Sequence, residues 1–205
     1  MTEIINYLFE AYATHSTFEI VLECLAFGFG IISVIYAKRE NILVYPTGIT
    51  CTLITMYFMF NERLIGHMMV NLFYTLMSIY GWWNWSRKEN DVVTVKISKF
   101  GFEDLSKASL IFFFIIFISY FLHEYFNTDL GTFASVDIFT SGIFVTAMWL
   151  MANKKLENWI LWIIGNVITI PLYFGSDKII LSVQYIIFTI LAIQGYIQWK
   201  KSLSK

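Results

Sequence analysis

The chain has 205 residues, of which 58% are hydrophobic and 14% charged, whereas soluble domains carry about 25% charged residues. This composition excludes an ordinary soluble domain, and a net charge of −1 offers no basic surface for nucleic acid. Catalysis is disfavoured because His15, His67 and His123 lie far apart and the sequence has no metal-ligand spacing, phosphate loop or nucleophile motif. We therefore expect a membrane protein that is not an enzyme and uses no metal or cofactor.

Residues 1–18 come first and carry apolar residues at helical spacing, which fits either an amphipathic helix on the membrane surface or a frayed tail. Seven stretches with few charges follow, at 24–37, 41–61, 64–86, 108–123, 138–153, 158–176 and 179–199. About 20 apolar residues cross a bilayer, and an edge residue or two brings the shorter stretches to that length. The sequence thus predicts an all-α integral membrane protein with seven transmembrane helices.

The basic residues predict the orientation of these spans. With seven spans the connecting segments alternate between two sides, and 12 of the 14 Lys and Arg residues fall on one side. Only Arg63 and Lys178 fall on the other. Because cytoplasmic loops are enriched in Lys and Arg, we expect the N-terminus outside and the C-terminus inside.

An internal repeat relates the first three spans to the last three. A shift of 117 residues pairs Gly48 with Gly165 and Tyr45 with Trp162, and further along a shift of 114 pairs Trp85 with Trp199. A three-helix unit followed directly by its copy would leave the copy upside down, so one linking helix restores the orientation. We therefore expect two parallel repeats, 19–88 and 131–205, joined by a cytoplasmic loop and linking helix over 89–130.

The densest polar pattern lies in the sixth span, where Trp159, Trp162 and Asn166 share one helical face. Polar side chains are costly in a bilayer and tend to face the protein interior. An interfacial tryptophan belt would explain Trp159 but not Asn166, which lies about two turns deeper. This face is predicted to line a cavity.

Other spans add polar groups: Asn71 and Tyr74 in the third and Gln184 in the seventh. Such side chains either line the same cavity or bridge helices without any ligand. Asp137 lies near the outer end of the fifth span and either faces the interior or points into water. Amides hydrogen-bond hydroxyl groups and π-faces attract organic cations, so the site suits a flat, polar, cationic small molecule.

The residues 157–173, ENWILWIIGNVITIPLY, resemble the WxxWxxxN signature of PnuC-type vitamin transporters, and IYGW at 79–82 resembles another element of that family. The resemblance covers roughly residues 19–201. It implies a 3+1+3 helix arrangement similar to that of SWEET transporters, in the bacterial inner membrane. It also implies facilitated diffusion of nicotinamide riboside, which a cytosolic kinase then traps as a phosphate.

The resemblance also implies which residues contact the substrate. These are Trp159, Trp162 and Asn166, with Asp137, Asn71 and Gln184 at polar positions of the family. Cys51 stands where many nicotinamide riboside transporters have Asn, and Gln184 stands where an acid can occur. Thiamine or another vitamin such as riboflavin therefore stays an alternative substrate, and a seven-helix receptor is the alternative from another class. The sequence is compatible with a homo-oligomer.

Overall fold

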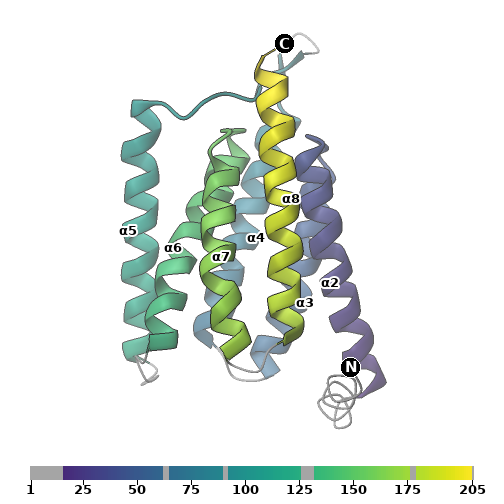
Figure 1. Cartoon of the computed structure of the whole chain (residues 1–205), viewed down its shortest axis with the longest axis vertical. Helices are drawn as coiled ribbons and strands as arrows, with labels where there is room; N and C mark the ends of the chain where they lie inside the picture. The colour runs from purple at the N-terminus through teal and green to yellow at the C-terminus, as the bar shows by residue number, and fades with distance from the viewer. Residues whose placement is uncertain (1–15, 62–64, 90–91, 126–131, 176–178, 205) are drawn as a thin grey trace.

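The computed structural model describes the chain apart from residues 1–15, 62–64, 90–91, 126–131, 176–178 and 205. The predicted amphipathic segment 1–18 therefore lies almost wholly outside the described residues. The elements, shown in Figure 1, are α2 (Thr17–Lys38), α3 (Val44–Asn61), α4 (Ile65–Ser86), β1 (Lys88–Glu89), β2 (Val92–Val93), α5 (Phe102–Tyr125), α6 (Thr132–Ala152), α7 (Asn158–Gly175) and α8 (Ile179–Leu203).

Local capping explains why the first helix is longer than the apolar stretch that predicted it. Ser16 and Glu19 form a capping box: the Glu19 N–H donates to Ser16 Oγ at 3.3 Å, and the Ser16 N–H donates to Glu19 Oε2 at 2.8 Å. This satisfies two backbone donors that a helix start otherwise leaves without partners. Consequently α2 begins at Thr17, before the first uncharged stretch at 24–37.

Six of the described helices pack as a closed ring. Going around it, α2 packs on α3, α3 on α4, α4 on α6, α6 on α7, α7 on α8, and α8 again on α2. The remaining helix, α5, lies outside the ring against α6, at the flank of the bundle in Figure 1. Gly142 of α6 allows this contact, because a Cβ there would lie 3.0 Å from the Phe112 ring of α5.

Five of the described helices, α2 and α5 to α8, are long and apolar enough to cross a membrane by length and composition. The sequence predicted seven spans, and α3 and α4 fall outside this set. Both carry hydroxyl and amide side chains that find partners inside the bundle. Thr55 Oγ1 donates to Cys51 O at 2.9 Å, and Thr52 and Thr75 share a hydrogen bond of 2.9 Å between these two helices. Polar helices of this kind are tolerated where the protein itself satisfies their polar groups.

The turns that follow α2 and α6 have the same backbone structure. Glu40 and Lys154, which are 114 residues apart, both adopt the left-handed conformation, with φ of 54° and 49°. The next N–H in each turn, of Asn41 and Lys155, donates at 2.9 Å to the carbonyl five residues earlier. The two connections are thus built alike, although neither uses glycine at its left-handed position.

The spacing of 114 residues between these two turns is shorter than the shift of 117 residues expected for the first half of the repeat. The difference is about one helical turn. The shift of 117 residues paired Tyr45 with Trp162, whereas the spacing of 114 matches Tyr45 with Trp159. A displacement of three residues is close to one turn of 3.6 residues, so it leaves apolar and polar faces almost in register. Sequence similarity between apolar helices therefore could not distinguish the two alignments.

Candidate functional site

The six-helix ring encloses a cavity of about 440 Å³. This volume lies within the range of about 300–1,000 Å³ that is typical of small-molecule sites. All six helices of the ring contribute to its wall, and none of its described lining residues belongs to α5. The cavity therefore depends on the ring rather than on the flanking helix.

One face of α7 supplies a row of five lining residues: Trp159, Trp162, Asn166, Thr169 and Tyr173. Their alternating spacing of three and four residues keeps them on one side of the helix. The predicted trio Trp159, Trp162 and Asn166 therefore lies on the cavity wall, and its contact with a substrate stays a prediction. The indole Nε1 of Trp159 is buried and has no hydrogen-bond partner among the described residues.

The other five predicted residues lie on the same wall: Cys51 of α3, Asn71 and Tyr74 of α4, Asp137 of α6 and Gln184 of α8. Cys51 and Gln184 approach each other beside Gly30 of α2, where a Cβ would lie 3.5 Å from both the Cys51 Sγ and the Gln184 Nε2. The two departures from the resembled family thus occupy one corner of the cavity. Asp137, for which the sequence left two orientations open, is part of the wall.

A column of stacked aromatic rings runs along the cavity wall, and the sequence analysis identified only its first member. Trp162 stacks on Phe144 at 5.5 Å between centroids, Phe144 on Tyr185 at 6.1 Å, and Tyr185 on Tyr173 at 5.4 Å. Gly165 makes room for the column, since a Cβ there would lie 2.3 Å from the Phe144 ring. The sequence signal that could have revealed the column is Tyr173, because it follows Asn166 by seven residues on the same helical face.

The cavity wall carries a single formal charge among its described residues, the carboxylate of Asp137. Three tyrosines from three helices, Tyr74, Tyr173 and Tyr185, lie near enough to interact with this charge. All three also line the cavity. The wall therefore combines aromatic faces, side-chain amides and one carboxylate.

Four aromatic side chains pack together near the end of the bundle where α2, α4, α6 and α8 end, which is the upper end in Figure 1. Tyr45 packs edge-on against Trp85 at 5.2 Å, and Trp159 packs edge-on against Trp199 at 5.4 Å. Trp85 and Trp199 also contact each other at 6.2 Å. The four rings are between 0% and 4% exposed, so they are packed inside this end of the bundle. We call them the aromatic plug.

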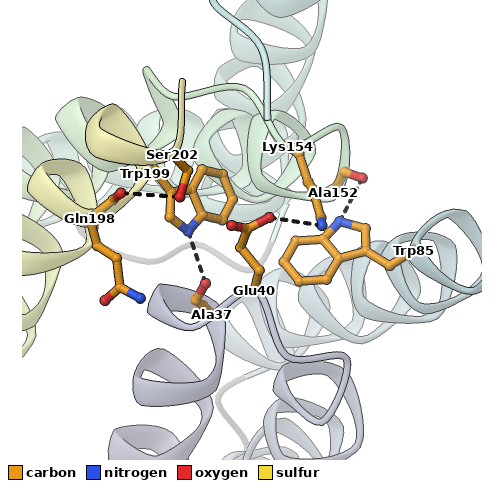
Figure 2. A network of polar contacts seen from close by, with 8 residues as sticks. All are labelled: Ala37, Glu40, Trp85, Ala152, Lys154, Gln198, Trp199 and Ser202. Atoms are coloured by element: carbon orange, nitrogen blue, oxygen red, sulfur yellow. Dashed lines mark hydrogen bonds and ion pairs between the residues drawn. The ribbon is translucent and has the colours of Figure 1, made fainter. Parts of the chain in front are cut away.

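Two crossed hydrogen bonds fix the plug to the opposite halves of the ring (Figure 2). Trp85 Nε1 of α4 donates to the Ala152 carbonyl of α6 at 3.1 Å, and Trp199 Nε1 of α8 donates to the Ala37 carbonyl of α2 at 3.2 Å. Between them Lys154 Nζ lies 3.2 Å from Glu40 Oε2 and 4.6 Å above the Trp85 ring. The two halves of the chain thus hold each other at this end.

Comparison with known families decides the identity of this bundle. Residues 20–201 match the model of a family described as nicotinamide mononucleotide transporter. The chain belongs to this transporter family. This match confirms the predicted membership of the PnuC-type family. The chain is accordingly a multi-pass membrane transporter and not an enzyme.

Relatives and a solved structure of this transporter family agree with the assignment. The nicotinamide riboside transporter PnuC of Escherichia coli (strain K12) is 25% identical over 198 residues, which cover 84% of this chain and 82% of the relative. The protein of the same name from Neisseria mucosa is also 25% identical, over 86% of this chain and 70% of the relative. A crystal structure of the vitamin B3 transporter PnuC superimposes with a TM-score of 0.70 at 21% identity, over 97% of this chain and 86% of that one. The structural likeness establishes the fold.

Proposed function

We propose that this transporter is a uniporter for nicotinamide riboside. The observation that carries the proposal is the cavity within the ring, on whose wall Trp162, Asn166 and the aromatic column meet. Nicotinamide riboside has a flat pyridinium ring that suits aromatic faces, and its ribose hydroxyls and carboxamide suit the amides of Asn71, Asn166 and Gln184. The names of the relatives support this choice of substrate.

Thiamine is the alternative substrate, because it is also a flat aromatic cation. The specific observation in its favour is the corner formed by Cys51 and Gln184 beside Gly30. Both residues depart there from the pattern of many nicotinamide riboside transporters. A binding comparison of the two vitamins with the purified protein therefore belongs to any test of substrate identity.

We further infer that residues 19–88 and 131–205 are parallel repeats, with α5 as the linking helix. Three observations support this arrangement: the like turns at Glu40 and Lys154, the crossed bonds of Trp85 and Trp199, and the position of α5 outside the ring. Rotating the ring by half a turn exchanges α2, α3 and α4 with α6, α7 and α8. Every helix contact around the ring is preserved by this exchange.

For the orientation in the membrane we propose that the upper end of the bundle in Figure 1 faces the cytosol. The basic residues support this, since Lys38, Arg39, Lys154, Lys155 and Lys200 all lie at this end. A reporter fused after Lys205 is expected to be active only in its cytosolic form, in the inner membrane of a bacterial host. A reporter that works only outside the cell would reverse the orientation.

Transport is proposed to follow the substrate gradient, with a cytosolic kinase removing the product as a phosphate. In proteoliposomes without a kinase, uptake at zero membrane potential should stop when the inner and outer concentrations are equal. A cation also gains about 2.3 kcal/mol per charge per 100 mV, so a potassium diffusion potential, negative inside, should raise the final level. The measurement is the uptake of labelled nicotinamide riboside and, in parallel, of thiamine.

Two results of this uptake experiment would contradict the proposal. Concentration of substrate by a proton or sodium gradient alone, at zero potential, would show coupled transport. Tight binding without any uptake would favour the receptor. Better uptake of thiamine than of nicotinamide riboside would leave the uniport mechanism standing and would make thiamine the substrate. Empty liposomes and liposomes without a potential are the controls.

A further inference from the structure

The carboxylate of Asp137 is the one formal charge among the described residues of the cavity wall. Asp137 lies in the second turn of α6 and is partly buried on the cavity wall. An ionisable side chain within a transmembrane segment is rare and marks a functional position by default. No Lys, Arg or His belongs to the described residues of the wall, so the formal charge of that wall is negative.

The surroundings of Asp137 extend this negative character. Tyr173 and Tyr185, which interact with its charge, are the last two rings of the aromatic column and stack at 5.4 Å. Tyr74 approaches from α4 on the other half of the ring. The faces of aromatic rings carry negative electrostatic potential, so the column and the carboxylate attract the same kind of ligand.

Two basic groups of the upper end have partners away from the cavity. Lys154 pairs with Glu40 at 3.2 Å, and Lys38 donates to Gln194 Oε1 at 2.7 Å. Neither lysine is part of the cavity wall. A cationic ligand that moves along the column toward Asp137 therefore meets aromatic faces and a carboxylate rather than positive side chains of the wall.

We propose that Asp137 determines the charge preference of the cavity, so that it accepts a planar aromatic cation over a neutral molecule of the same shape. The inference rests on the proposed function and adds a property to it: selection by charge, separate from recognition of the ribose and the carboxamide. It makes Asp137 the specificity residue and leaves the affinity that both compounds share to contacts such as that of Asn166.

The test compares nicotinamide riboside with its 1,4-dihydro form, which keeps the ribose and the carboxamide but has an uncharged ring. Binding of both compounds is measured by calorimetry with the purified full-length transporter. The wild type should bind the cation about tenfold more tightly than the neutral form. In Asp137→Asn, which keeps the size of the side chain, cation binding should weaken by about tenfold while the neutral form binds as before.

Two matched variants separate charge from shape. Asp137→Glu keeps the charge and should keep the preference for the cation. Asn166→Ala removes a contact that both compounds share and should weaken both alike. If Asp137→Asn does not yield a monodisperse protein, Asp137→Ser replaces it and carries the same expectation.

The outcomes also separate this inference from the proposed function. Equal weakening of both compounds in Asp137→Asn would show that Asp137 only shapes the cavity, and the inference would be wrong while the function stands. A wild type that binds both forms equally would refute it as well. A wild type that binds neither compound would instead contradict nicotinamide riboside as the substrate.

Discussion

Trp162→Ala is expected to raise the Kd for nicotinamide riboside by about ten- to a hundredfold, and Asn166→Ala by a similar factor. Loss of one aromatic face or of one buried amide contact typically costs about 1–3 kcal/mol, and each 1.4 kcal/mol is tenfold in affinity. Trp162 has the further role of ending the aromatic column, where it stacks on Phe144 at 5.5 Å. Calorimetry with the purified variants measures the effect.

The matched control for this experiment is Trp83→Ala. Trp83 lies on α4, is 58% exposed and is not part of the cavity wall, so its loss should leave the Kd unchanged. Wild-type affinity in a folded Trp162→Ala, Asn166→Ala double variant would show that α7 does not bind the substrate.

Trp85→Ala and Trp199→Ala should each destabilise the protein strongly, by about 3–5 kcal/mol, the usual cost of truncating a buried tryptophan. Each change removes a ring from the aromatic plug and also the donor to a buried carbonyl, of Ala152 or Ala37. Because the two indoles occupy like positions in the two halves, the losses should be similar. Thermal unfolding in detergent measures them, and binding should change less than stability.

Two further sets of variants define the origin of this loss. Trp85→Phe and Trp199→Phe keep a ring but lose the N–H and part of the ring volume, and should cost about 1–3 kcal/mol, less than the alanine variants. Gly195→Ala places a Cβ 2.6 Å from the Trp159 ring and should also lower the melting temperature, whereas Gly28→Ala has open space and should not. A melting temperature unaffected by Trp199→Ala would mean that the plug does not hold the bundle together.

Much of the site could be predicted because membrane burial makes polar residues conspicuous. Asn166 is informative since an amide two turns inside an apolar span needs a polar neighbour, and its spacing from Trp162 fixes the face. All eight residues predicted for the site lie on one cavity wall. Their binding to a substrate awaits the experiments above.

The sequence was less informative where apolar residues have several equivalent uses. Phe144 and Tyr185 are two of 39 aromatic residues, and nothing in their spacing distinguishes the stacked column from lipid-facing rings. The same ambiguity leaves two alignments of the proposed repeat near Tyr45, the predicted shift of 117 residues and the spacing of 114 between the turns at Glu40 and Lys154. The beginning of α2 was missed for another reason, because a capping box of polar residues extends a helix beyond its apolar core.

The position of α5 outside the ring has a practical consequence for engineering. One face of this helix packs in the bundle: Phe112 and Ile116 lie against α6 at Gly142, and Ala108, Ile115, Ser119 and His123 are buried. Phe113 and Phe117 are 65% and 66% exposed on its other side, and no described residue of α5 reaches the cavity. Fluorophores or spin labels can therefore be attached at these two positions to follow the transporter in lipid without touching its substrate. A foreign apolar helix of equal length that keeps this packed face should be able to replace α5.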